Sequence, residues 1–399
     1  MIVSLEIILM LLTLISLKIN FFKKNFYFIF NIFWLLCLLI SQSNYFELYQ
    51  ISEKTYEIIL LGIISFNLSM FMPLKKIKNL KIEEIREVKK KWIIIFVIFY
   101  FFINIFLIFR ISKNIDFINK YYLVRFFYYG IDGEYLFKYS ILQIIYEVFQ
   151  SFNECILLYG IYMILENKIK KYFYYSFFNF LLFTFISGSR ELLFYLILIF
   201  ILCIKIRSFK LFLKEIIFII LVVFIISLNR GSSSLKAMIE LLILYFTGSI
   251  NFMDYHLREI DLKQYYGKLF FSSIITPIEF ILKKINFIKD ITIYKVGGEL
   301  ARTVNISQTQ TYNALPTMFY IFYKDMRMVG VIFYSLLLGI FYKVIYFSNK
   351  INNATLVLFS YLETILIYSI LVYKFNKFIH IVPILFFYII MKKRKQNER

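Results

Sequence analysis

The sequence predicts an all-α polytopic membrane protein with about eleven transmembrane helices. Hydrophobic residues make up 61% of the chain, whereas soluble domains contain about 45–50%. These residues fall into separate runs, most of which approach the ~20 residues that a helix needs to cross a bilayer. Lysine and arginine gather in the short stretches between the runs, which is the pattern of cytoplasmic loops.

The predicted membrane domain occupies the whole chain, 1–399, with eight spans in 1–229 and three in 328–391. The first run contains Glu6 and lacks the basic start of a signal peptide, so we interpret it as a retained span. Residues 188–190 alone separate two runs, which predicts a tight helical hairpin. The predicted spans are 2–19, 26–41, 56–74, 92–111, 140–165, 172–187, 191–206, 215–229, 328–347, 354–373 and 376–391.

The basic loops predict the orientation. The tail 392–399 is strongly basic, and so are the loops 75–91, 166–171 and 207–214, whereas the loop 42–55 holds a single lysine. Alternate loops are therefore rich and poor in positive charge, as the positive-inside rule requires. We expect the N-terminus to lie outside and the C-terminus in the cytoplasm.

One large loop, 230–327, is expected on the outer side. It contains amphipathic segments, Leu235–Phe246 and Phe270–Ile285, in which apolar residues recur at helical spacing beside lysines. Such segments lie in the membrane interface or fold over the spans. We expect a lid or vestibule there rather than a separate domain.

Composition also excludes several classes of function. The net charge of +21 comes from short loops and not from one basic face, so no nucleic-acid partner is expected. The three cysteines, Cys37, Cys155 and Cys203, lie apart within apolar runs, which argues against a disulfide framework or a zinc site. Nucleotide-binding and metalloprotease motifs are absent. We therefore expect neither a metal nor a cofactor.

Arginines on the predicted outer face are the first candidate site residues, because that face is normally poor in arginine. Arg190 and Arg230 have glycine and serine neighbours that let a ligand approach the backbone, and Arg258 and Arg302 lie further along the chain. A guanidinium group can donate two parallel hydrogen bonds to phosphate oxygens, so the four arginines together suggest a diphosphate site. Anchoring to lipid headgroups is the alternative for each of them.

His256 is the only histidine outside the predicted spans. A histidine can act as a general base on a sugar hydroxyl. A structural role for a lone histidine remains the alternative.

Four short segments together resemble the Wzy-type oligosaccharide repeat-unit polymerases, the family that includes O-antigen and capsule polymerases. The fourth segment is similar to the family's Asp-Phe-Gly ending, except that Met326 and Arg327 stand where Phe and Gly are expected. The segments are Gly188-Ser189-Arg190, Asn229-Arg230-Gly231, Tyr245-Phe246-Thr247-Gly248-Ser249-Ile250, and Asn313-Ala314-Leu315-Pro316-Thr317 with Tyr320 and Tyr323-Lys324-Asp325.

The resemblance implies a metal-independent, membrane-embedded glycosyltransferase of the GT-C type in the plasma membrane of a bacterium. Such an enzyme polymerises undecaprenyl-diphosphate-linked oligosaccharide units into surface polysaccharide on the outer face, with membrane lipid and a chain-length regulator as further partners. The candidate bases for the acceptor hydroxyl are Asp325, Glu299, Asp254 and His256. The candidate sugar-binding residues are Asn313, Thr317, Tyr320 and Tyr323, although an interfacial aromatic belt explains the tyrosines equally well.

Two alternatives remain open. An O-antigen ligase has the same architecture and a similar donor, but its acceptor is a lipid core. A flippase or another transporter of lipid-linked oligosaccharides usually shows internal repeats, short loops and binding residues at the midplane. The single large loop and the absence of an internal repeat argue against a transporter.

Overall fold

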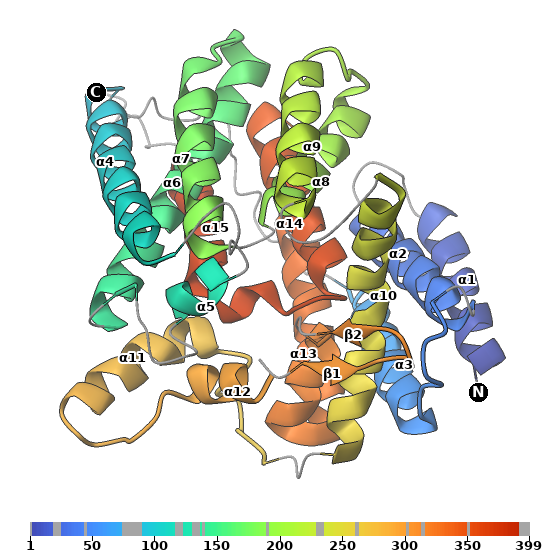
Figure 1. Ribbon diagram of the computed structural model, residues 1–399. Helices are drawn as coiled ribbons and strands as arrows, with labels where there is room; N and C mark the ends of the chain where they lie inside the picture. Colours follow the sequence, from blue (N-terminus) through green and yellow to red (C-terminus); the bar gives the residue numbers. More distant parts are fainter. Residues whose placement is uncertain are drawn as a thin grey trace, which may run out of the picture. The chain divides into compact units, whose positions relative to one another are not determined.

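A computed structural model shows how the helices pack. It describes residues 2–18, 25–43, 46–73, 90–115, 123–129, 136–137, 140–188, 191–228, 235–259, 263–300, 303–312, 316–348 and 352–390. Within these ranges the chain is almost entirely helical, with a single two-stranded antiparallel sheet (Figure 1).

The chain divides into two compact units. Unit 1 comprises Met1–Asn79, Ile239–Asn349 and Ile365–Lys377, and unit 2 comprises Leu80–Met238, Lys350–Thr364 and Phe378–Arg399. The elements wholly in unit 1 are α1 (Ile2–Lys18), α2 (Asn25–Gln42), α3 (Glu53–Leu68), α11 (Ser272–Lys284), α12 (Thr292–Leu300), β1 (Val304–Asn305), β2 (Thr311–Tyr312), α13 (Met318–Ser348) and the short 3-10 helix η1 (Lys374–Asn376).

Unit 2 contains the remaining helices, and two helices cross the division. The elements wholly in unit 2 are α4 (Lys90–Asn114), α5 (Leu123–Tyr129), α6 (Ser140–Asn167), α7 (Lys171–Ser187), α8 (Glu191–Ile206), α9 (Leu213–Leu228) and α15 (Phe378–Ile390). The two that cross it are α10 (Leu235–Glu259) and α14 (Asn353–Tyr368).

The centre of unit 1 is the close pair α3 and α13. Glycines allow this approach: a Cβ on Gly339 would lie 2.5 Å from the Phe66 carbonyl oxygen, closer than any real contact. Near the same end of α3, the buried Lys343 ammonium donates to the carbonyl oxygens of Ser69 and Met70 at 2.9 and 3.0 Å. A cation there satisfies carbonyl groups that a helix leaves without partners at its C-terminal end. This packing fixes α13 against the rest of unit 1.

The β hairpin lies against α10 in unit 1 (Figure 1). The Tyr312 hydroxyl of β2 donates to the Tyr245 carbonyl of α10 at 2.7 Å. The segment before α3 joins the same layer, because the Tyr49 amide donates to the Ile306 carbonyl at 2.9 Å. Three stretches far apart in sequence therefore meet at one end of unit 1.

Unit 2 has polar groups inside and apolar groups outside. Between α4, α6 and α7, the Tyr146 hydroxyl donates to Asn104 Oδ1 at 2.7 Å, and the Asn179 amide donates to the Val97 carbonyl at 2.9 Å. On the outer face of α4, Trp92 and Phe102 are each 64% exposed. Hydrogen bonds between buried polar side chains and an apolar exterior are typical of helices that pack in lipid.

Three described helices are long and apolar enough to cross a membrane, over Lys91–Asn114, Ile141–Asn167 and Met318–Phe347. Shorter apolar helices accompany them at Glu6–Ser16, Phe26–Gln42, Asn353–Tyr368 and Phe378–Phe387. The chain thus has helices suited to a membrane protein. The number of spans and their orientation stay predictions.

Each of the eleven predicted spans coincides with a helix, but some boundaries differ. The helix at the ninth predicted span begins at Met318 and not at 328, because an additional helical stretch precedes a kink at Met326 and Arg327. The helix at the tenth ends at Tyr368, where a turn begins. Within the predicted outer loop, the first amphipathic segment extends to the 25-residue helix α10.

Candidate functional site

A buried lysine lies at the centre of the candidate site in unit 1. Lys324 of α13 has a side chain that is 1% exposed, and its ammonium pairs with the Glu299 carboxylate of α12. The same ammonium lies 5.8 Å from the centre of the Tyr265 ring and 5.7 Å from that of Tyr320. Burial of a charge is costly without such partners, and aromatic faces also attract cations. The cluster thus concentrates a paired cation among aromatic rings.

Two hydroxyl groups of this cluster have no hydrogen-bond partner in the part of the chain that the structure describes. The hydroxyl oxygens of Tyr265 and Tyr320 are buried and make no hydrogen bond to any described residue. Burial raises the pKa of Tyr265, and the nearby Glu299 carboxylate raises that pKa further. The Tyr265 hydroxyl therefore stays protonated at neutral pH, and it is available to donate to a ligand oxygen. Leaving a buried hydroxyl unpaired costs about 1–3 kcal/mol, which a polar ligand would recover.

His256 of α10 lies beside this cluster. Its side chain is buried, and its ring centre is 6.0 Å from that of Tyr320 and 4.5 Å from that of Phe252. The imidazole therefore packs among aromatic rings, those of Tyr320 and Phe252. Its deep burial is consistent with the structural alternative as well as with contact to a ligand.

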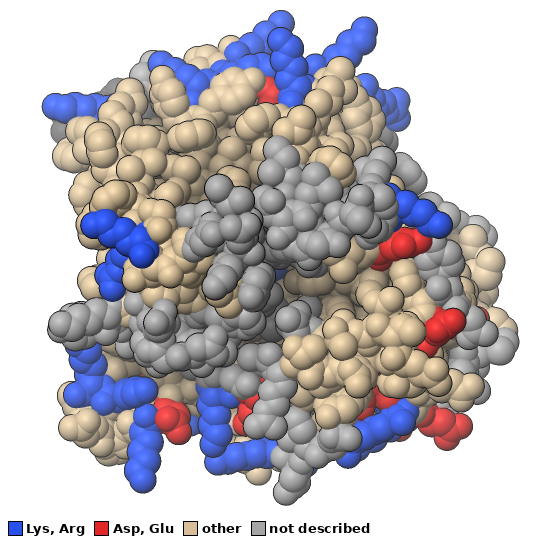
Figure 2. Space-filling model, viewed as in Figure 1, with Lys and Arg blue, Asp and Glu red and all other residues tan. Residues whose placement is uncertain are grey.

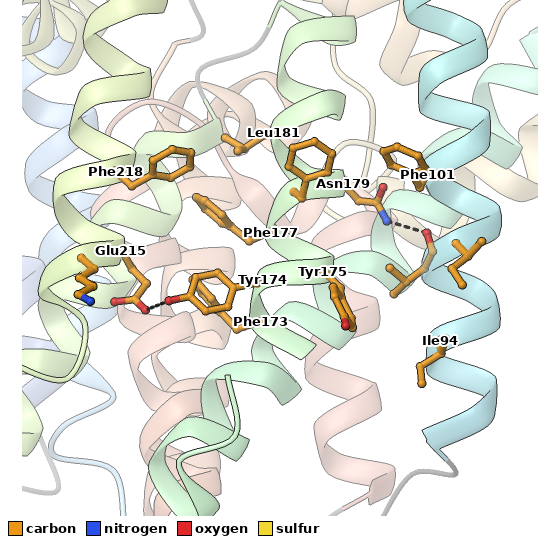
Figure 3. Close-up of a pocket in the computed structure, with 14 residues that line it drawn as sticks. Ile94, Phe101, Phe173, Tyr174, Tyr175, Phe177, Asn179, Leu181, Glu215 and Phe218 are labelled. Atoms are coloured by element: carbon orange, nitrogen blue, oxygen red, sulfur yellow. Dashed lines mark hydrogen bonds between the residues drawn. The ribbon is translucent and has the colours of Figure 1, made fainter. Parts of the chain in front are cut away.

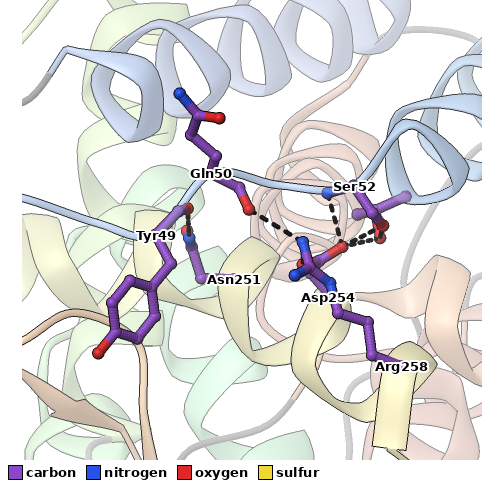
Figure 4. Close-up of polar contacts among 7 residues, drawn as sticks. Tyr49, Gln50, Ser52, Asn251, Asp254 and Arg258 are labelled. Atoms are coloured by element: carbon purple, nitrogen blue, oxygen red, sulfur yellow. Dashed lines mark hydrogen bonds and ion pairs between the residues drawn. The ribbon is translucent and has the colours of Figure 1, made fainter.

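Asp254 and Arg258, one helical turn apart on α10, hold the segment before α3 (Figure 4). Asp254 Oδ1 accepts the Ser52 amide at 2.9 Å, the Ser52 hydroxyl, and the Thr55 hydroxyl at 2.6 Å. Arg258 Nη2 pairs with Asp254 Oδ2 at 2.6 Å and donates to the Gln50 carbonyl at 3.0 Å. The Arg258 side chain is still 54% exposed. Its guanidinium is thus oriented and also accessible to an anion.

Asp325 follows Lys324 on α13 and organises the loop before α11. Its buried carboxylate accepts three backbone N–H groups, from Gly267 at 2.9 Å, Leu269 at 3.3 Å and Phe270 at 3.0 Å. Its backbone carbonyl also accepts the Tyr265 amide at 3.2 Å. Asp325 therefore positions the tyrosine that faces Lys324. Glu299, whose side chain is 32% exposed, is the more accessible of these two candidate bases.

Tyr323 lies between two further cations. Its ring centre is 5.4 Å from the Lys54 ammonium and 5.5 Å from the Arg327 guanidinium carbon. Arg327 has φ 55° and ψ −144°, a region that is close to one used almost only by glycine. The backbone at Arg327 thus takes a glycine-type turn although the residue is an arginine. Thr317, at the start of the same helical stretch, is buried and donates to Met253 Sδ at 3.0 Å.

The structure brings most of the predicted site residues into unit 1. Four of the predicted residues lie outside the described residues, and these are Arg190, Arg230, Arg302 and Asn313. The remaining eight lie on α10, on α12 or in the stretch from 317 to 325, and these are Asp254, Arg258, His256, Glu299, Asp325, Thr317, Tyr320 and Tyr323.

Sequence reasoning missed three members of this site, Lys324, Tyr265 and Lys54. The available signal for Lys324 was its place in the apolar stretch 318–323, where an ionisable residue is a functional candidate. Tyr265 lies in the loop before α11 and Lys54 in the first turn of α3, and no sequence pattern indicates their contacts. Among the residues that the structure describes, no three His, Cys, Asp or Glu side chains lie close enough to share a metal ion.

This arrangement can hold an anion, accept a proton and donate hydrogen bonds within one unit. Arg258 and Lys54 are accessible cations, Glu299 is an accessible carboxylate, and Tyr265 and Tyr320 offer hydroxyl groups. Comparison of the chain with protein-family models, with curated proteins and with solved structures found no match.

Proposed function

We propose that this protein is a membrane glycosyltransferase that polymerises undecaprenyl-diphosphate-linked oligosaccharide units into surface polysaccharide. The observation that carries the proposal is the cluster around Lys324. It combines a buried cation, a partly exposed carboxylate and two tyrosine hydroxyls that have no partner among the described residues, in the same unit as the accessible Arg258. A sugar linked to a lipid diphosphate needs such a combination of aromatic, hydrogen-bonding and cationic groups.

Each group has a role in the proposed transfer. The acceptor hydroxyl attacks the anomeric carbon of the donor sugar, the new C–O bond forms, and the bond from that carbon to the phosphate oxygen breaks. The lipid diphosphate leaves with the bonding electrons, and Arg258 stabilises its charge. Arg190, Arg230 and Arg302 stay sequence-based candidates for phosphate binding, because they lie outside the described residues. Glu299, oriented by Lys324, takes the proton from the acceptor hydroxyl.

Glu299 fits the role of base better than the other two candidate carboxylates. Its side chain is partly exposed, whereas the carboxylate of Asp325 is buried and occupied by three backbone amides. Asp254 is similarly engaged with Arg258 and with the segment before α3. Asp325 and Asp254 then act as positioning residues.

The turn at Arg327 also supports the resemblance on which the proposal rests. The polymerase family has glycine at the matching position, and Arg327 takes backbone angles near those reserved for glycine. The replacement of Phe-Gly by Met326-Arg327 therefore leaves a glycine-type turn after Asp325.

The proposal includes a bacterial plasma membrane location with the site on the outer face, as the loop charges predict. A reporter fused at Lys263 should then read as outside, and one fused at Glu84 as cytoplasmic. The opposite readings would place the site on the wrong side for lipid-linked units that have already crossed the membrane.

Deletion of the gene, followed by gel analysis of the surface glycan, tests the function. We expect the long-chain ladder to disappear and a single repeat unit to remain, and the normal ladder to return with a plasmid copy. Full-length polymer stranded on its lipid carrier would instead indicate a ligase. Lipid-linked units trapped on the cytoplasmic face would indicate a flippase.

A further inference from the structure

Unit 2 contains a cavity of about 870 Å³ between α4, α7 and α9, and none of its lining residues belongs to the candidate site (Figure 3). Its volume lies within the range of about 300–1,000 Å³ that is usual for ligand pockets. Most of its wall is hydrocarbon, with side chains that include Ile98, Phe101, Phe177, Leu181 and Phe218. The cavity therefore suits an apolar chain along most of its length.

One end of the cavity is polar. Glu215 of α9 lines it, and its carboxylate Oε1 accepts the Tyr174 hydroxyl at 2.6 Å and the Lys170 ammonium at 3.1 Å. The other oxygen, Oε2, is buried and has no hydrogen-bond partner among the described residues, although the residue is only 3% exposed. A buried carboxylate oxygen is stable only with a donor. Glu215 thus marks a place for a hydrogen-bond donor of a ligand.

The charge around this end is positive. Lys214 lines the cavity next to Glu215 and is exposed. Exposed Lys171 and Lys210 lie close by in sequence, and Lys and Arg gather at this end of unit 2 where α7 and α9 begin (Figure 2). Lys170, Lys214 and Glu215 together carry a net charge of about +1 at neutral pH. A ligand with one negative charge would neutralise it.

We propose that the cavity holds an acyl chain of an anionic phospholipid whose headgroup carries a hydroxyl, the chemistry of phosphatidylglycerol. The acyl chain lies among the side chains of α4, α7 and α9, the phosphate pairs with Lys214, and the headgroup hydroxyl donates to Glu215 Oε2. A phosphatidylcholine headgroup has neither the net charge nor the donor. The loop charges predict that this end of unit 2 lies in the cytoplasmic leaflet, and the lipid site shares no residue with the proposed transfer site.

Native mass spectrometry of the purified full-length protein tests this inference. The protein is titrated with dioleoyl phosphatidylglycerol, with dioleoyl phosphatidylethanolamine and with dioleoyl phosphatidylcholine in separate experiments. We expect one molecule of phosphatidylglycerol to bind, about tenfold more tightly than phosphatidylcholine, which is a difference of about 1.4 kcal/mol in binding free energy. Equal affinity for the three lipids, or a preference for phosphatidylethanolamine, would overturn the proposal.

Two variants with matched controls separate the headgroup from the chain. Lys214→Gln should abolish the preference for phosphatidylglycerol. Lys210→Gln should keep it, because this exposed lysine lies just before α9 and does not line the cavity. Ile98→Trp should fill the cavity and prevent tight binding of every lipid. Ile95→Trp, on an exposed part of α4 outside the cavity, should not. Equal effects within either pair would contradict a specific site.

Discussion

Replacement of Asp325 separates a positioning role from a catalytic one. The carboxylate accepts backbone N–H groups from Gly267, Leu269 and Phe270, and each buried donor left without an acceptor costs about 1–3 kcal/mol. Asp325→Ala removes both acceptor oxygens and leaves all three donors without a partner, so we expect a loss of about 3 kcal/mol or more. Asp325→Asn keeps one oxygen, which still serves Gly267 and Leu269, and leaves only the Phe270 amide facing an NH₂ group.

Thermal unfolding of the purified protein in detergent measures both losses. A loss of about 2 kcal/mol lowers the unfolding midpoint by about 4–8 °C in a unit of this size. The decrease should be within or near this range for Asp325→Asn and larger for Asp325→Ala. Asp290→Asn, at an exposed loop position, should leave the midpoint unchanged. If Asp325→Asn abolishes polymer synthesis while the midpoint stays at the wild-type value, Asp325 acts directly on the substrate and the positioning role is refuted.

Three further predictions concern packing, phosphate binding and the turn. Gly339→Ala should lower the unfolding midpoint by several degrees because its Cβ would meet the Phe66 carbonyl oxygen of α3. Gly297→Ala, with no atom within 4 Å of the new Cβ, should not lower it, and equal midpoints would contradict the close pairing. Arg190→Ala and Arg230→Ala should each abolish polymer in complemented cells at normal protein level, and a normal polymer length in both would reject the diphosphate assignment. Arg327→Gly should be more stable than Arg327→Ala by about 1–3 kcal/mol, because only glycine relieves the strained turn. A larger free energy of unfolding for Arg327→Ala, measured with denaturant, would disprove the strain.

The helices were predictable because their signal is local. Each apolar run predicted a helix that the structure contains, and run lengths near the thickness of a bilayer were enough to place them. The boundaries near Met318 and Tyr368 were less predictable, because helix ends depend on turns and on tertiary contacts. The division into two units was not predicted, since it depends on contacts between helices far apart in sequence.

The candidate site was predictable only in part. Family-like segments pointed to Tyr320, Tyr323 and Asp325. The structure places Tyr320 beside the buried Lys324, whereas Tyr323 contacts Lys54 and Arg327 and Asp325 binds the loop before α11. The partner of Lys324, Glu299, was a candidate without any known contact, and Tyr265 was overlooked altogether. Sequence spacing cannot indicate an ion pair between α12 and α13, because the loops that join them set the geometry. The interpretation of Asp325 as a base also changes once its three amide donors are known.

The most direct test of the account is glycosyl transfer by the purified protein in liposomes that contain undecaprenyl-diphosphate-linked repeat units. The wild-type protein should produce a ladder of lengthening glycan and release undecaprenyl diphosphate. Glu299→Gln should lose at least about 100-fold in rate, as expected for removal of a general base, and Glu53→Gln, at an exposed position on α3, should not. Wild-type protein that forms no glycosidic bond, or a Glu299→Gln variant that polymerises at the wild-type rate, would contradict the account.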